Sequence, residues 1–343
     1  MAKTGVGKVA GLAGRAKGAA LVAAGVGVTA ANALAVRKLL QLDPHVRRTD
    51  AGLARVYTVC GEDGERVRVL NVGGAYQSAT YLGERWHEPV FEYYRAFDRM
   101  FEAEGAVAGS GADADAGVAV EAAQPADGAQ LADATCSAGA AQPAGATRPA
   151  DAPFAIRDVL MIGGGGCAWP KHALMTRPGL RVDVVESDPA VAEIARRFFF
   201  VDKLERELSS REGSAQRFNL IVDDGLGYLA GCEKRYDAIC NDAFAGAAAA
   251  ADLAGAAGLR AVKDRLNPGG LYLVNVVSGP EWREFRHLIR LINELDRFFA
   301  HVTVIFASDE RFSDKDNYLV IASDAEYAFS DVIPTPERKD AAC

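Results

Sequence analysis

Four consecutive glycines, Gly163, Gly164, Gly165 and Gly166, interrupt the run VLMIGGGGCAWPKHALM of residues 159–175. The apolar residues before them predict a strand, and the proline after them is typical of a helix start. Glycine accepts positive φ angles and lets a ligand approach the backbone, while a helix N-terminus presents free N–H groups. In a doubly wound sheet the turn after the first strand binds nucleotides. The pattern therefore predicts a nucleotide-binding loop, and the alternative is a flexible turn that holds no ligand.

Glu186 stands 20 residues after Gly166 and ends the apolar run RVDVVE. An acid at the end of the second strand of such a unit is placed to accept hydrogen bonds from a ribose diol, and it repels a 2′-phosphate. The alternative is a solvated strand end. Asp188 directly precedes Pro189, so we expect it to cap the next helix instead of binding a ligand.

Two more carboxylates follow predicted strands. In IVDDGLGYL, residues 221–229, Asp224 precedes Gly225 and is the candidate for contacting an adenine amino group, with Asp223 as the alternative. In YDAICNDAF, residues 236–244, Asp242 ends a strand at the mouth of the expected crevice, where a carboxylate can hold an amine or act as a base. The competing interpretations are a plain turn for Asp224 and a helix cap for Asp242.

Together these positions indicate a ligand that contains adenosine. The loop reads GGGGC, which is not the GxGxxG pattern of dinucleotide-binding proteins, and no Walker lysine follows it. The net charge of −8 argues against nucleic acid as a partner. No Cys/His cluster has the spacing of zinc ligands, so we expect no metal.

The elements that must position these residues alternate between strand and helix from residue 156 onward. This alternation predicts a mostly parallel sheet covered by helices on both faces, and the last two strands, with no helix between them, predict an antiparallel hairpin. Upstream, residues 54–59 and 66–72 flank the turn GEDGE and predict a β-hairpin. Residues 91–101 have apolar residues at helical spacing and predict a helix.

Composition divides the chain of 343 residues further. We expect a small β domain with the first helix at 51–104, a nucleoside-binding catalytic domain at 153–330 and a tail at 331–343. Residues 105–152 consist almost wholly of Ala, Gly, Asp, Pro, Gln, Ser and Thr, a composition that predicts a disordered insertion.

The leader, residues 1–50, is basic and rich in Ala and Gly, and residues 18–36 carry no charge. Three interpretations remain open: a membrane anchor, a cleaved signal peptide, or a tail without either function. The expected location is the cytoplasm, with membrane association through residues 18–36 if they form an anchor.

From about residue 54 to 323, apart from the insertion, the chain resembles the spermidine synthase family, the polyamine aminopropyltransferases. AYQSATYL and FEYY fit the family's N-terminal Gln and Tyr, which gives Gln77 and Tyr93. The family's ribose-binding segment is matched by VVESDP, and its adenine-side segment by the pair Asp224–Gly225. Its catalytic segment is matched by DAFAG. Gly166 and Ala245 stand where the family has Asp, and the segments NDAFAG and LNPGGLYLVNVV look closer to a spermidine synthase-like branch.

The resemblance implies an α/β, Rossmann-like class I methyltransferase fold, with a mostly parallel seven-stranded sheet behind a small N-terminal β domain. It implies aminopropyl transfer from decarboxylated S-adenosylmethionine, or a donor related to S-adenosylmethionine, to a small amine, without a metal. Asp242 and Tyr93 would be catalytic. Gln77, the four glycines, Glu186, Asp224 and Gly225 would hold the donor. The family also implies a homodimer. The alternatives are a methyltransferase that uses S-adenosylmethionine and a nucleoside-binding sensor or scaffold without catalysis.

Overall fold

A computed structural model describes most of the chain. The described residues are 45–60, 64–106, 153–210, 216–245, 248–249, 251–278, 282–307 and 316–334. The uncharged run 18–36, nearly all of the insertion predicted at 105–152 and the end of the tail lie outside these residues.

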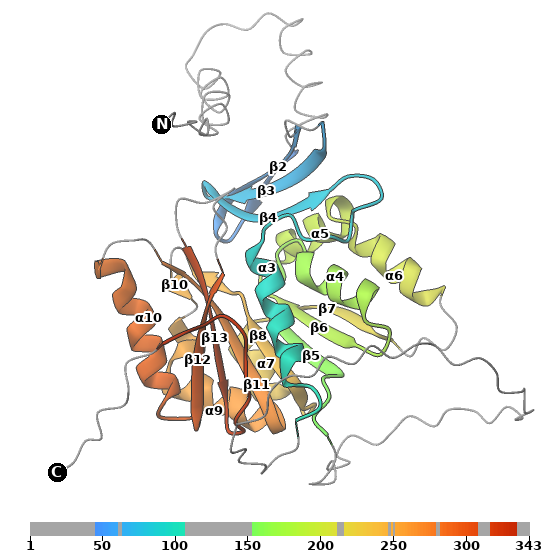
Figure 1. Cartoon of the computed structure of the whole chain (residues 1–343). Helices are drawn as coiled ribbons and strands as arrows, with labels where there is room; N and C mark the ends of the chain where they lie inside the picture. Colours follow the sequence, from blue (N-terminus) through green and yellow to red (C-terminus); the bar gives the residue numbers. More distant parts are fainter. Residues whose placement is uncertain are drawn as a thin grey trace, which may run out of the picture.

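The N-terminal part forms an antiparallel sheet in the order β1-β2-β3-β4, so the predicted hairpin is confirmed and extended by a strand on each side. Its strands are His45–Thr49, Gly52–Cys60, Arg66–Val72 and Ala75–Tyr81. In Figure 1 this sheet, in blue, lies above the main sheet and beside α5. An apolar cluster that includes Leu70 of β3 and Ile194 of α5 joins the two parts.

The main sheet has the order β14-β12-β13-β11-β8-β5-β6-β7. Its strands are β5 Asp158–Ile162, β6 Arg181–Glu186, β7 Phe218–Val222, β8 Tyr236–Asn241, β11 Leu266–Ser278, β12 His301–Ala307, β13 Asp316–Ser323 and β14 Val332–Ile333. The strands from β7 to β11 are parallel, and β13 and β12 form the predicted antiparallel pair. The class I methyltransferase-like α/β fold is thus confirmed, with the two-residue β14 as an eighth strand at the edge.

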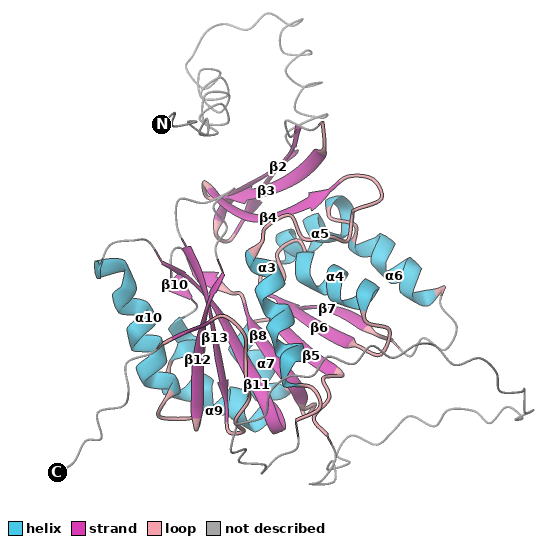
Figure 2. Ribbon diagram, viewed as in Figure 1, coloured by secondary structure: helices cyan, strands magenta, loops and turns pink. Residues whose placement is uncertain are grey.

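Helices cover both faces of this sheet (Figure 2). They are α3 Tyr93–Ala96, the 3-10 helix η2 Phe97–Ala103, α4 Ala168–Thr176, α5 Pro189–Phe198, α6 Val201–Ser209, α7 Gly225–Gly231, α8 Ala251–Ala254, α9 Ala256–Arg265 and α10 Trp282–Leu295. One apolar core lies between the sheet and the group α3, η2, α4 and α6, and a second lies between the sheet and α7, α9 and α10. A short ribbon of β9, Phe244–Ala245, and β10, Ala248–Ala249, follows β8.

The helix predicted over residues 91–101 is only partly correct. It is α-helical for one turn and then continues as the 3-10 helix η2. Phe97, Met100 and Ala103 are each at most 1% exposed, and their spacing of three places them on one face of a 3-10 helix. Packing of that face onto the sheet accounts for the tighter winding.

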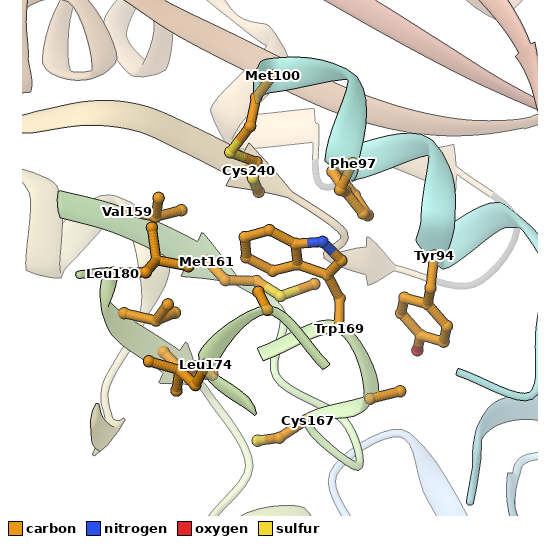
Figure 3. Packing of buried hydrophobic residues seen from close by; sticks show 14 of the residues in the cluster. Tyr94, Phe97, Met100, Val159, Met161, Cys167, Trp169, Leu174, Leu180 and Cys240 are labelled. Carbon is orange, nitrogen blue, oxygen red and sulfur yellow. The ribbon is translucent and has the colours of Figure 1, made fainter. Parts of the chain in front are cut away.

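Trp169 lies at the centre of this packing. Its indole ring is fully buried among side chains that include Phe97, Met161 and Leu174 (Figure 3). Its ring nitrogen donates a hydrogen bond of 2.9 Å to the Asp98 carboxylate on η2. A buried indole N–H needs such a partner, so this bond fixes the helix after the glycine loop against η2.

Candidate functional site

The glycine loop lies at the point where the strand order reverses, between β5 and its neighbours β6 and β8. Open α/β sheets bind ligands at the carboxyl ends of their strands at such a point. Gly163 has φ +90°, and a side chain there would come within 2.6 Å of the Asp242 backbone. The Asp242 amide in turn donates to the Ile162 carbonyl at 2.8 Å. The loop after β5 and the segment after β8 therefore touch through backbone atoms.

Glu186 reaches the glycine loop from the end of β6. One carboxylate oxygen accepts a hydrogen bond of 2.9 Å from the Gly165 amide, and the other accepts one of 3.0 Å from the Asp188 amide. Burial raises the pKa of this carboxyl, and the backbone donors oppose that rise. The carboxylate is thus oriented beside the loop, and each oxygen keeps a lone pair for a ligand hydroxyl.

Asp188 caps α5, as predicted, because its side chain accepts from the amides of Ala190 and Val191. Its second oxygen accepts a hydrogen bond of 2.7 Å from the Asp50 amide. Asp50 lies in the turn between β1 and β2, so this carboxylate also ties the N-terminal sheet to the region beside Glu186.

Asp224 follows β7 and caps α7, where its carboxylate accepts from the Gly227 amide at 2.8 Å. Its partner Gly225 is packed against β5: a side chain there would come within 2.5 Å of the Ile162 methyl carbon. The pair thus lies near the same edge of the sheet as the glycine loop, with Asp224 exposed.

Asp242 follows β8 and carries a strongly perturbed carboxyl group. Its Oδ1 accepts a hydrogen bond of 2.8 Å from the Asn275 amide of β11. Surrounding protein raises the pKa of this carboxyl to about 7, although the Asn275 donor opposes the rise. A carboxylate with such a pKa is suited to accept a proton near neutral pH.

β4 covers the loop from the N-terminal sheet. The Gln77 carbonyl lies 3.5 Å from the position of a side-chain carbon on Gly165 and accepts a hydrogen bond of 3.3 Å from the Tyr94 hydroxyl. Tyr94 is buried, and desolvation together with the nearby Asp242 charge raises its pKa. Tyr93 stacks on Tyr94 with ring centroids 4.2 Å apart.

The structure therefore brings Tyr94 close to Asp242, whereas the sequence singled out Tyr93. Two adjacent tyrosines in one helix give no sequence signal that separates them. Asn275 was also missed, since it lies inside an apolar strand far from Asp242 in the chain.

Gly166 has no room for a side chain. A Cβ there would come within 2.5 Å of the Ser78 hydroxyl and 2.7 Å of the Phe199 ring. Ser78 is fully buried, so neither neighbour moves freely. The packing around this position therefore suits glycine.

No group of three or more His, Cys, Asp or Glu side chains suited to a metal ion occurs among the described residues. In the same part of the chain, no helix is both long and apolar enough to cross a membrane.

Comparison with known proteins agrees with this architecture. Residues 147–310 match the family model of the spermine/spermidine synthase domain. This match covers just under half of the chain. A polyamine aminopropyltransferase of Aeropyrum pernix is 30% identical over 149 residues, which are 43% of this chain and 45% of that protein. That of Methanocaldococcus jannaschii is 35% identical over 86 residues, 25% of this chain and 27% of the relative. The chain thus matches less than half of the length of either relative.

Solved spermidine synthases share the fold. A probable spermidine synthase from Corynebacterium glutamicum superimposes with a TM-score of 0.53 at 20% identity, covering 82% of this chain and 81% of the other. A spermidine synthase in complex with the transition-state analogue AdoDATO gives a TM-score of 0.53 at 14% identity, with 82% and 73% coverage. Identities this low establish the similarity of fold alone.

Proposed function

We propose that this protein transfers an aminopropyl group from decarboxylated S-adenosylmethionine to a small amine. The observation that carries the proposal is the meeting of the glycine loop, Glu186 and Asp242 at one edge of the sheet, beneath β4. The family domain and the aminopropyltransferase names of the relatives support the same reaction class.

In this proposal Glu186 binds the ribose hydroxyls and the loop backbone accommodates the nucleoside. Asp224 and Gly225 lie on the adenine side, and Gln77 with Tyr93 and Tyr94 covers the reacting end. The absence of a side chain on Gly166 leaves donor binding to these groups.

Asp242 is the proposed base. The nitrogen of the acceptor forms a bond to the aminopropyl carbon, the bond from that carbon to sulfur breaks, and methylthioadenosine leaves with the electron pair. The proton lost by the amine passes to the Asp242 carboxylate, whose pKa near 7 suits this transfer. Holding both reactants in one crevice supplies much of the rate enhancement.

The test is calorimetric titration with methylthioadenosine, decarboxylated S-adenosylmethionine and S-adenosylmethionine, followed by turnover assays with a panel of amines. Tighter binding of the decarboxylated donor and formation of methylthioadenosine only when an amine is present are the expected results. Preference for S-adenosylmethionine, with no aminopropyl product, would replace the proposal by methyl transfer. No binding of any of the three compounds would remove the nucleoside site altogether.

A further inference from the structure

Asn275 lies within β11, one position after Val274, which pairs with Asn241 of β8. It is 3% exposed, and its side chain faces the carboxylate that follows β8. A buried amide inside an apolar strand must use its polar atoms to avoid a desolvation cost. In this case the Asn275 amide nitrogen donates to Asp242 Oδ1 at 2.8 Å.

The backbone that carries Asp242 is held separately. The Asp242 amide donates to Ile162, and the Asn241 side chain accepts from the Ala243 amide at 3.1 Å while donating to Tyr272 at 2.9 Å. These bonds fix the chain on both sides of Asp242. They leave the side-chain rotamer to Asn275.

The two oxygens of Asp242 are not equivalent. Oδ1 is occupied by Asn275, while Oδ2 accepts no hydrogen bond within the described part of the chain. The charge of this carboxylate raises the pKa of two titratable groups there, Tyr94 of α3 and Cys240 of β8. Neither is a cation, so no ion pair supports the charge of Asp242 in that region.

We propose that Asn275 is a positioning residue that acts through Asp242: it holds Oδ1 and thereby directs Oδ2 toward the acceptor amine. This inference rests on the proposed function. The hydrogen bond from the Asn275 amide is stronger to the ionised form of Asp242 than to the protonated form. Asn275 therefore also favours the carboxylate over the carboxylic acid. The direction of this effect agrees with the lowering of the Asp242 pKa by Asn275.

The first test compares Asn275→Leu and Asn275→Ala with the wild type and with Asn219→Leu. Asn219 is a matched control, because it also donates to a buried aspartate, Asp183, at 2.6 Å, but on β7 at the opposite end of the strands. Methylthioadenosine affinity, kcat, KM and the pH profile of kcat are measured for each variant, together with the melting temperature.

We expect both Asn275 variants to bind methylthioadenosine within about threefold of the wild type, and to lose about tenfold in kcat at pH 7, as for the loss of one hydrogen bond to a charged group. The acid limb of the profile should move to higher pH, so that the deficit narrows at pH 9. Asn275→Gln, which restores a donor, should recover part of kcat. Asn219→Leu should leave the acid limb unmoved. An equal loss at every pH, or an unchanged kcat, would overturn the proposal.

A second measurement does not require turnover. The NMR signal of the Asp242 carboxyl carbon is identified by its disappearance in Asp242→Asn. Its chemical shift is then followed with pH in the wild type and in Asn275→Leu. The pKa of Asp242 should rise in the variant, and an unchanged pKa would refute the role of Asn275. If the wild type gave no product with any amine, the proposed function would fail, while this titration would still decide whether Asn275 controls Asp242. If Asn275→Leu does not fold, Asn275→Ala and Asn275→Gln serve the same comparison.

Discussion

Lys171 buries its ammonium group between the N-terminal sheet and the main domain. It is 1% exposed and donates to the Thr80 hydroxyl at 3.1 Å and to the Phe199 carbonyl at 2.8 Å, both neutral acceptors. Burial lowers its pKa from 10.5 to about 7, with no carboxylate to offset the effect among the described residues. The side chain therefore links α4 to β4 and to the end of α5, and the desolvation of its ammonium group lowers the free energy of unfolding.

The sign of the pH dependence follows from proton binding. Between pH 7 and 10.5 the unfolded chain holds the lysine proton more tightly than the folded protein, so the free energy of unfolding rises with pH in this window. The cost of the buried lysine is about 4 kcal/mol at pH 7 and about 2 kcal/mol at pH 9. Lys171→Met removes this cost with an unbranched apolar side chain that is one atom shorter. It also loses the hydrogen bonds to Thr80 and Phe199 at every pH compared.

The assay is urea denaturation of the wild type and Lys171→Met at pH 7, 8 and 9. The stability of the variant relative to the wild type should fall by about 2 kcal/mol from pH 7 to pH 9. Lys234→Met is the control, because Asp183 and Asp158 pair with Lys234 and raise its pKa. Its difference from the wild type should stay constant over this range, since Lys234 is protonated in both states. Parallel curves for Lys171→Met and the wild type would refute the reasoning, because they would show that the buried amine keeps its proton throughout.

Three further outcomes test the site. Asp242→Asn should abolish aminopropyl transfer and retain methylthioadenosine binding, and full turnover by this variant would exclude Asp242 as the base. In the wild type, kcat should rise as the pH increases through about 7, where the carboxyl ionises. Glu186→Ala should weaken methylthioadenosine binding by about 1–3 kcal/mol in calorimetry, the cost of unpaired ribose hydroxyls and loop amides, and equal affinity would remove the ribose assignment. Gly166→Asp should lower the melting temperature, because the new side chain meets Ser78 and Phe199. The control Gly179→Asp lies in open space and should change the melting temperature little. Equal melting temperatures for the two variants would mean that Ser78 and Phe199 move aside.

Local sequence was sufficient for several features. The alternation of apolar strands and amphipathic helices predicts the parallel sheet, because backbone hydrogen bonds and burial impose periods of two and 3.6 residues on the chain. The cap formed by Asp188 before Pro189 was equally predictable, since it needs only the next three residues. The glycine loop and the spacing to Glu186 likewise predicted that the two would meet, because adjacent parallel strands end at the same edge.

Other features of the candidate site depended on neighbours that are distant in the chain. Only the packing of α3 beneath β4 brings the Tyr94 hydroxyl to the Gln77 carbonyl. Gly166 is closed to a side chain by the Phe199 ring and by Ser78, which the fold brings in on β4 of the N-terminal sheet.

Asp242 shows the same division between sequence and tertiary structure. Its type and its position after a strand marked it as a candidate base from the sequence alone. Its pKa and its orientation depend on burial and on Asn275, which β11 brings alongside β8. The sequence by itself indicated candidate groups for the proposed chemistry and the strand ends on which they stand. The tertiary structure decided how far each group is removed from water and which oxygen remains free, because desolvation and cross-strand hydrogen bonds exist only once the sheet has formed.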